Sequence, residues 1–236
     1  DFDPLESEPN VCLRYVHLNS SFGYPDAVIL PGSKTTIADL TALHESGMAE
    51  QLKNYVAAGG TVLGLCGGYQ MLGRQVHDPD GSEGGQEWSA GLNLLPVETL
   101  ISREKITRQR QSISLYPQSG LPVLGYELHQ GITRLIRSSD QATLKDFHPI
   151  FADDNLGIVN TSQSIWGCYL HGLFDNGSWR RSWLNVLRKR RGLPTLPTGI
   201  SNYREQREVM LDSLAELIKE FVDLTPLTQY LGAEDS

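Results

Sequence analysis

The sequence predicts an α/β protein with a mostly parallel sheet, helices packed on it and an antiparallel extension. Two observations support this fold class. In the first 75 residues, short apolar runs typical of buried strands alternate with segments whose apolar residues have helical spacing. Further along, β-forming stretches follow one another without helices between them, which indicates antiparallel strands.

Composition excludes several classes of protein. Of the 236 residues, 39% are hydrophobic and 20% charged, which is enough apolar material for a core and unlike a disordered or fibrous chain. No run approaches the roughly 20 apolar residues of a membrane helix. The net charge of −8 disfavours nucleic acid and anionic membranes as partners. The opening residues do not resemble a secretory signal, so we expect a soluble cytoplasmic chain.

In the first third of the chain, strands and helices are expected in turn. Residues 11–18 alternate in polarity and predict a strand, and residues 26–30 predict a buried strand that ends in a turn. Apolar residues at helical spacing predict a helix over residues 40–55. Residues 61–65 then predict another buried strand, which leads into a short helix over residues 69–72.

The rest of the chain predicts a loop, several strands and two helices. The loop covers residues 75–91, which are polar and rich in glycine. The last helix is expected to turn Val209, Leu214, Leu217, Ile218 and Phe221 inward. The expected strands and helices are residues 92–107, 112–115, 122–128 and 132–136, a hairpin of 156–160 with 164–170, and helices at 179–190 and 204–222.

One domain is expected over residues 1–224, with a tail at 225–236, because no linker divides the chain. Domains of this class usually begin with a buried strand, whereas residues 1–9 form a charged turn. We therefore expect the first strand upstream of residue 1; a surface arm at the start of the domain is the alternative.

Gly64-Leu65-Cys66-Gly67-Gly68 has the form of a nucleophile elbow with cysteine as the nucleophile. A residue in a sharp strand-to-helix turn projects out of the sheet, and flanking glycines let the backbone pass closely. The start of the following helix lowers the pKa of a thiol, and the Gly67 amide would face a developing oxyanion. The alternative is a tight turn that holds a buried cysteine without a catalytic role.

Two further strand ends carry candidate groups. His171 follows a strand and precedes a glycine, which makes it the natural base for Cys66, although a lone histidine is often structural. Gly32, in a Pro-Gly-Ser turn, offers a second oxyanion amide, or else the turn only caps a helix. Glu127 and His129 share one face of a strand. The remaining cysteines, Cys12 and Cys168, suit no disulfide framework or zinc site and are expected to be buried.

Four ordered motifs resemble the C-terminal glutaminase domain of the cobyric acid synthase family, and the similarity runs from residue 1 to about residue 224. The segment 34–40 distinguishes this domain from the similar one of cobyrinic acid a,c-diamide synthases. The motifs are Leu30-Pro31-Gly32-Ser33-Lys34-Thr35-Thr36-Ile37-Ala38-Asp39-Leu40, Gly64-Leu65-Cys66-Gly67-Gly68-Tyr69-Gln70-Met71-Leu72-Gly73, Gly125-Tyr126-Glu127-Leu128-His129 and Tyr169-Leu170-His171-Gly172-Leu173-Phe174-Asp175-Asn176.

The resemblance implies a flavodoxin-like, class I glutamine amidotransferase fold and a glutaminase reaction through a cysteine thioester. It assigns the nucleophile to Cys66, the base to His171 and a glutamine-lining role to Gln70. The amides of Gly32 and Gly67 would form the oxyanion hole, and no metal is implied. Ordinary members of the class carry a glutamate two residues after the histidine, where this chain has Leu173. Three residues remain as candidates for orienting the histidine: Asp175, Glu127 and Asp3.

The resemblance also implies a partner, an N-terminal synthetase domain of the same polypeptide that uses ATP and Mg²⁺ to amidate four carboxylates of a corrinoid, adenosylcobyrinic acid a,c-diamide. This chain has no Gly-x-x-x-x-Gly-Lys-Ser/Thr loop, so we expect it to bind no ATP itself. The alternatives are the sister diamide synthase, a catalytically inactive binding domain, or a cysteine peptidase of the same architecture. The basic residues among positions 180–191, five arginines and Lys189, are read as a helix end rather than as a nucleic-acid or phosphate site, and docking against the synthetase domain is a further alternative.

Overall fold

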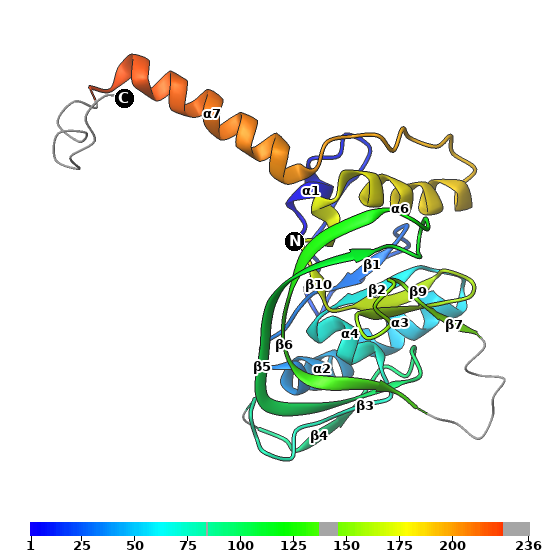
Figure 1. Cartoon of the computed structure of the whole chain (residues 1–236). Coiled ribbons are helices and arrows are strands. Elements are labelled where there is room, and N and C mark those ends of the chain that lie inside the picture. Colours follow the sequence, from blue (N-terminus) through cyan, green and yellow to red (C-terminus); the bar gives the residue numbers. More distant parts are fainter. Residues whose placement is uncertain (84, 137–145, 224–236) are drawn as a thin grey trace.

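The computed structural model describes residues 1–83, 85–136 and 146–223, and its centre is a five-stranded sheet (Figure 1). The strand order is β1-β2-β9-β8-β7. Strands β1, β2 and β9 are parallel to one another, and β8 pairs antiparallel with both β9 and β7. This arrangement confirms the α/β class and the hairpin expected near residue 160. The strands are β1 (Val28–Leu30), β2 (Val62–Leu65), β9 (Ile165–Cys168), β8 (Gly157–Asn160) and β7 (Phe147–Pro149).

Helices cover both faces of this sheet because its strands alternate their side chains between two cores. Val62 packs in the core that α2, α3 and α4 cover, whereas its neighbour Leu63 packs with Trp179 of α6. The expected helix over residues 40–55 is in fact two helices, because Gly47 has a φ of 76° and breaks the helical path. The helices are α2 (Thr36–Glu45), α3 (Met48–Ala57), α4 (Gly67–Leu72) and α6 (Gly177–Arg190).

The antiparallel extension is a second sheet in the order β10-β6-β5-β3-β4. The expected breaks near residues 108–111 and 129–131 do not occur, because cross-strand pairing continues through these polar residues, with one irregularity between Leu100 and Lys105. The expected loop at 75–91 contains two short strands. The strands are β10 (Leu170–His171), β6 (Pro122–Leu135), β5 (Val97–Ile113), β3 (Gln75–His77) and β4 (Trp88–Ala90).

The N-terminal segment is an arm rather than a strand. Residues 11–18 have no strand partner among the described residues, and Tyr15 is 72% exposed, so the prediction of a strand there is wrong. The arm begins with α1 (Asp3–Glu6) and is anchored by Leu5, which is buried in the core beside α6. Glu8 adds buried ion pairs with Arg180 and Arg181. Alternating polarity was therefore not enough to make residues 11–18 a strand, because no neighbouring strand edge in the described structure pairs with them.

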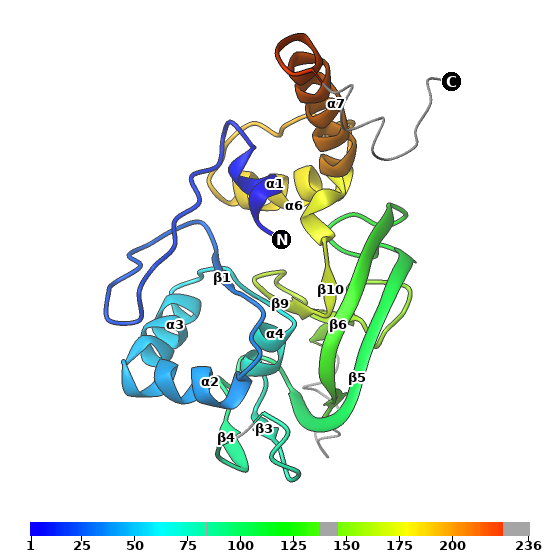
Figure 2. The ribbon, with the colours of Figure 1, turned by 90° about the vertical axis from the view of Figure 1, so that its left-hand side faces the viewer.

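The last described helix, α7 (Tyr203–Phe221), points away from the rest of the molecule in both views (Figures 1 and 2). The residues expected to face inward are all exposed, which corrects the sequence prediction: Val209, Leu214, Leu217, Ile218 and Phe221. The periodicity identified the helix correctly but could not show whether its apolar face has a partner. Residue 224 and the expected tail at 225–236 lie outside the described residues.

Candidate active site

Cys66 occupies the turn between β2 and α4 in a strained conformation, with φ 52° and ψ −112°. The flanking glycines are required by close packing. A Cβ on Gly64 would lie 2.4 Å from the backbone of Gly68, and one on Gly68 would lie 2.1 Å from the carbonyl oxygen of Leu30. Positive φ at a non-glycine residue persists where the surroundings enforce it, often at a functional site. The elbow expected from the sequence is therefore present.

Three strand ends meet at Gly32, which directly follows the Pro31 turn after β1. A Cβ on Gly32 would lie 3.5 Å from Cβ of Cys66 and 3.5 Å from Cε1 of His171. Gly32 thus lies beside both the candidate nucleophile and the candidate base. Figure 2 shows the end of β1, the start of α4 and β10 gathered in the middle of the molecule. The expectation that these strand ends converge is met.

Two backbone amides are available at this point. The N–H groups of Gly32 and Gly67 have no hydrogen-bond acceptor among the residues that the structure describes. Gly67 also packs closely on the Gly32 loop, since a Cβ on it would lie 2.7 Å from the backbone nitrogen of Ser33. Free amides beside a nucleophile are the groups that stabilise an oxyanion.

His171 lies on β10, and its imidazole is held through one nitrogen. Nδ1 lies 2.8 Å from Oδ2 of Asp1, and the other oxygen of that carboxylate accepts a hydrogen bond of 2.8 Å from the Gly172 amide. The Tyr126 ring stacks on the imidazole at 5.1 Å between centroids. Nε2 is buried and has no partner in the described part of the chain. With Nδ1 donating to Asp1, the tautomer leaves Nε2 free to accept a proton.

Asp1 was not among the residues that the sequence suggested for this position. Its carboxylate reaches His171 because the arm packs on η1 (Leu173–Asp175), where the Phe2 and Phe174 rings lie 6.4 Å apart. The two residues are 170 positions apart in the chain. Apolar Phe2 and Leu5, on either side of Asp3 and Pro4, were the available signal that this segment docks rather than extends into solvent.

The three expected orienting residues form no hydrogen bond or ion pair with the imidazole in the described structure, where its partner is Asp1. Asp175 lies near Gly172, and burial raises the pKa of its carboxyl. Asp3 sits in the first turn of α1. Glu127 forms ion pairs with Arg108 and Arg110. Burial alone would raise the pKa of Glu127, but the hydrogen bonds from the two arginines outweigh it and hold this pKa below its usual value.

Glu127 and His129 share one face of β6, as expected, and their side chains lie 3.5 Å apart. The His129 ring stacks on Tyr169 with 3.7 Å between ring centroids. Burial lowers the pKa of His129, although the neighbouring Glu127 opposes this effect. This histidine belongs to a packed network under the second sheet and is 7% exposed.

Cys66 and Gln70 are each hydrogen-bonded to β6 of the second sheet. The Cys66 thiol donates to the carbonyl oxygen of Leu128 at 3.3 Å, so β6 passes directly over the nucleophile. Gln70 is 2% exposed and fully engaged. Its Nε2 donates to the Gln130 carbonyl and the Tyr169 hydroxyl, and its Oε1 accepts from Thr36. Gln70 therefore ties the walls of the site together and has no free amide hydrogen.

The remaining candidates lie elsewhere. Cys12 is exposed, contrary to expectation, because the arm that carries it is not a strand, whereas Cys168 is fully buried. Burial raises the pKa of Cys168 to about 12. Across the described ranges, no cluster suited to a metal ion and no helix able to cross a membrane is found.

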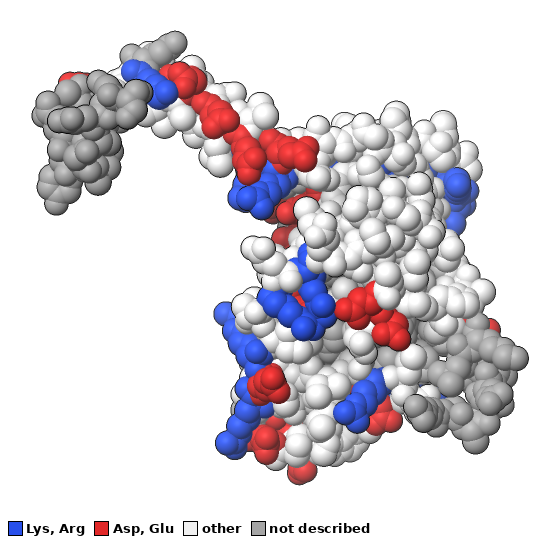
Figure 3. All heavy atoms as spheres, viewed as in Figure 1, with Lys and Arg blue, Asp and Glu red and all other residues white. Residues whose placement is uncertain are grey.

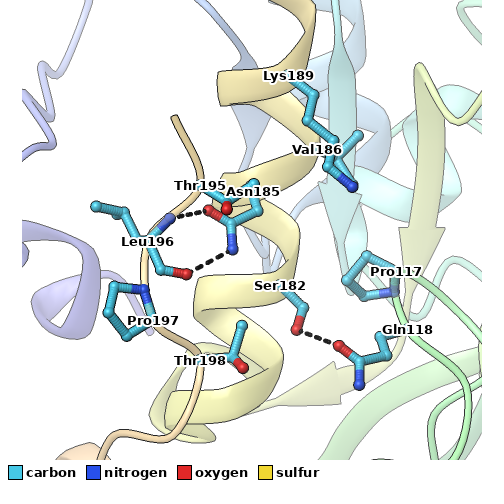
Figure 4. Close-up of a pocket in the computed structure, with 10 residues that line it drawn as sticks. All are labelled: Pro117, Gln118, Ser182, Asn185, Val186, Lys189, Thr195, Leu196, Pro197 and Thr198. Carbon is cyan, nitrogen blue, oxygen red and sulfur yellow. Dashed lines mark hydrogen bonds between the residues drawn. The ribbon is translucent and has the colours of Figure 1, made fainter. Parts of the chain in front are cut away.

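The basic residues of α6 make structural contacts. Arg190 donates to Thr61 and to the Ser162 carbonyl, and Arg191 pairs with Asp26. A hollow of about 470 Å³ lies between α6, residues 195–198 and residues 117–118 (Figure 4). Across it, the Asn185 amide holds both backbone groups of Leu196. Neither feature contains residues of the candidate site.

The CobB/CobQ-like glutamine amidotransferase domain model matches residues 1–179, and the chain belongs to this family. The structure of PurLQS from Thermotoga maritima shares the fold, with a TM-score of 0.55 and 16% identity over 79% of this chain and 91% of that one. The match to this family confirms the class of enzyme expected from the sequence, a glutamine-hydrolysing amidotransferase.

The curated relatives narrow the comparison further. The chain is 66% identical over 229 residues to the cobyric acid synthase of Rippkaea orientalis, covering 96% of this chain and 46% of the relative. It is 57% identical over 235 residues to that of Synechocystis sp., covering 100% of this chain and 46% of the relative. The chain thus spans about half the length of the curated relatives that it matches.

Proposed function

We propose that this chain is the glutaminase part of a cobyric acid synthase, which supplies ammonia to a synthetase part of the same polypeptide. The observation that carries the proposal is the meeting of Cys66 and His171 at Gly32. The similarity to cobyric acid synthases at 57–66% identity supports the choice of this synthase over the sister diamide synthase.

The chemistry begins with the transfer of the Cys66 thiol proton to Nε2 of His171. The Cys66 sulfur attacks the side-chain carboxamide carbon of glutamine, and the carbonyl oxygen takes the negative charge. The amides of Gly32 and Gly67 donate to that oxygen. Collapse of the intermediate breaks the C–N bond, and the proton held by His171 leaves with the nitrogen as ammonia.

A thioester between Cys66 and the glutamyl group remains. His171 then accepts a proton from water, whose oxygen attacks the thioester carbon through the same oxyanion arrangement. The sulfur leaves and recovers the proton, so glutamate is released and the enzyme is regenerated. Asp1 would act as a positioning residue, because its carboxylate holds Nδ1 and stabilises the imidazolium formed in each half of the reaction.

The ammonia would be used by the other half of the longer polypeptide, in the cytoplasm. That half would bind ATP and Mg²⁺, activate carboxylates b, d, e and g of adenosylcobyrinic acid a,c-diamide, and form amides with the ammonia. Gln70 is proposed to keep the wall of the glutamine site in place through its contacts with Thr36, Gln130 and Tyr169.

The test compares glutamine with ammonia as the nitrogen source. In the longer polypeptide, with ATP·Mg²⁺ and the corrinoid, we expect Cys66→Ala to abolish glutamine-dependent amidation while sparing amidation by added ammonia. His171→Ala should lower glutamine hydrolysis by a factor on the order of 10² or more, and His129→Asn provides a matched comparison.

Mass spectra of the corrinoid provide the readout. The 236-residue chain alone should leave the corrinoid unchanged, and amidation by this chain alone would overturn the proposal. Absence of glutamine hydrolysis in both the wild type and a folded Cys66→Ala variant would instead favour a non-catalytic binding domain. Amidation of cobyrinic acid only as far as the a,c-diamide, with no reaction of the diamide itself, would point to the sister synthase.

A further inference from the structure

Helix α7 is fixed at its base, and its remaining length projects from the body of the molecule (Figures 1 and 2). Asn202 caps its first turn with Glu205, and the same Asn202 side chain accepts a hydrogen bond of 3.0 Å from the Gly177 amide of α6. Helix α7 also contacts η1. A 19-residue helix is about 28 Å long, so its far end lies well beyond these anchors.

One face of α7 is a continuous apolar stripe. Met210, Leu214, Leu217 and Phe221 follow a spacing of four, three and four residues, and Leu211 and Ile218 lie beside them, which is the pattern of a helix that packs on another surface. All six are exposed against the described residues, from 43% for Ile218 to 81% for Phe221. We call these six residues the α7 stripe.

The opposite face of α7 is charged and mostly acidic, with Lys219 as its basic member. Glu205, Glu208, Asp212 and Glu216 lie roughly half a turn from the stripe at about 100° per residue. Figure 3 shows acidic side chains in a row along this helix. A helix that segregates apolar and charged residues so clearly is built to bury one face, and exposed apolar patches of this kind mark interaction sites.

The part of the longer polypeptide that lies outside this chain is the best candidate to cover the α7 stripe. The backbone nitrogen of Asp1 and the side chain of Arg207, in the first turns of α7, both lie near the carboxyl of Asp175. Residues that precede Asp1 in a longer polypeptide would therefore emerge beside the base of α7. The curated relatives contain a little more than twice the length of this chain, so an occupant of domain size is available.

Tethering also favours this occupant over a second copy of the chain. A segment joined covalently near the base of the helix has an effective concentration in the millimolar range, which a separate copy reaches only at comparable protein concentration. The e and g positions that flank the stripe in a coiled coil are Leu211, Ser213, Ile218 and Glu220, which carry charge of one sign only and so supply no opposite charges to pair one copy with another.

We propose that the α7 stripe is a docking surface for the remainder of the longer polypeptide, and that α7 thereby fixes the synthetase half relative to the glutaminase site. This inference rests on the proposed function for the identity of the partner. Docking at α7 places the partner at the end of the molecule where Asp1 and His171 lie, because both the arm and the helix base pack on η1.

A photo-crosslinking amino acid at position 214 of the longer polypeptide tests the occupant. We expect intramolecular crosslinks from position 214 to residues outside the 236-residue chain, identified by peptide mass spectrometry. The same probe at Asp212, on the acidic face, should give at most a tenth of that yield. Crosslinks to a second copy, crosslinks confined to the 236-residue chain, equal yields at both positions, or none at position 214 would each overturn the proposal.

Two matched pairs of charge substitutions test whether docking through the α7 stripe protects the helix from hydrogen exchange. Leu214→Glu with Leu217→Glu places two carboxylates on the stripe, whereas Val209→Glu with Ala215→Glu adds the same charge off it. We expect the first pair to raise amide hydrogen exchange of residues 210–221 in the longer polypeptide at least about tenfold, and the second pair to leave it unchanged. Equal exchange in both pairs would overturn docking through the stripe. Neither readout requires glutamine hydrolysis, so failure of the glutaminase assignment would be seen separately.

Discussion

The carboxylate of Asp1 holds both the Nδ1 of His171 and the amide of Gly172, each at 2.8 Å. One residue of the arm therefore fixes the ring and the backbone that follows it. The position two residues after the histidine is Leu173, which is buried and carries no charge. In this chain the acidic partner of the histidine thus comes from a segment distant in sequence.

Replacement of Asp1 tests whether this contact supports catalysis. For Asp1→Asn we expect kcat for glutamine hydrolysis to fall at least about tenfold, because a neutral amide stabilises the imidazolium less well and can present the wrong hydrogen-bonding group to Nδ1. KM should change less than twofold, and Asp1→Glu should recover part of kcat. Asp3→Asn is the matched control, expected to retain kcat. An equal loss in both variants, or a loss in KM alone, would contradict a positioning role for Asp1.

The three cysteines are predicted to differ in reactivity. A glutamine-mimicking diazoketone should label Cys66 alone, because this thiol stands at the start of α4 beside the free amides. Iodoacetamide should also reach exposed Cys12 in the native protein. Cys168 should react only after unfolding, because burial raises its pKa to about 12. Peptide mass spectrometry locates each label, and diazoketone labelling of Cys12 or Cys168 would count against the elbow as the reactive site.

Gly68→Ala is predicted to destabilise the protein by about 1–3 kcal/mol, although alanine favours helices. The added Cβ would lie 2.1 Å from the carbonyl oxygen of Leu30, so α4 must move away from the end of β1. We expect glutamine hydrolysis to fall as well, since that movement separates Gly67 from Gly32. Gly199→Ala, with no atom within 4 Å of the new Cβ, is the control. Urea unfolding measures the difference, and equal stability of the two variants would disprove the tight packing.

Glu127→Gln should lower the free energy of unfolding by about 1–3 kcal/mol at pH 7, because Arg108 and Arg110 lose their shared carboxylate. The pKa of Glu127 lies below its usual 4.5, so its contribution is complete above pH 4.5 and is lost as the pH falls further. The gap between wild type and variant should therefore narrow at pH 3.5. Glu216→Gln, at an exposed pair with Lys219, should change stability by less than about 0.5 kcal/mol. A gap that is constant with pH would contradict this account.

The sequence was sufficient for features that depend on neighbours in the chain. Glycines around Cys66 indicated the elbow because only a residue without Cβ permits such close passage, and the structure has that turn. Short apolar runs identified the parallel strands, and parallel strands bring their ends to the same edge of a sheet. Gly32, Cys66 and His171 therefore could be expected to meet before any coordinates were known.

Tertiary structure alone decided the features that depend on distant partners. Asp1 reaches His171 across 170 residues because Leu5 and Glu8 anchor the arm on α6. Residues 11–18 alternate like a strand but find no strand edge to pair with in the described part of the chain, whereas β5 and β6 continue through polar residues because each supplies the other with hydrogen bonds. The periodicity of α7 fixed which face is apolar, but not what covers it. Local pattern determines how a segment can fold, and packing against remote residues determines which groups it finally meets.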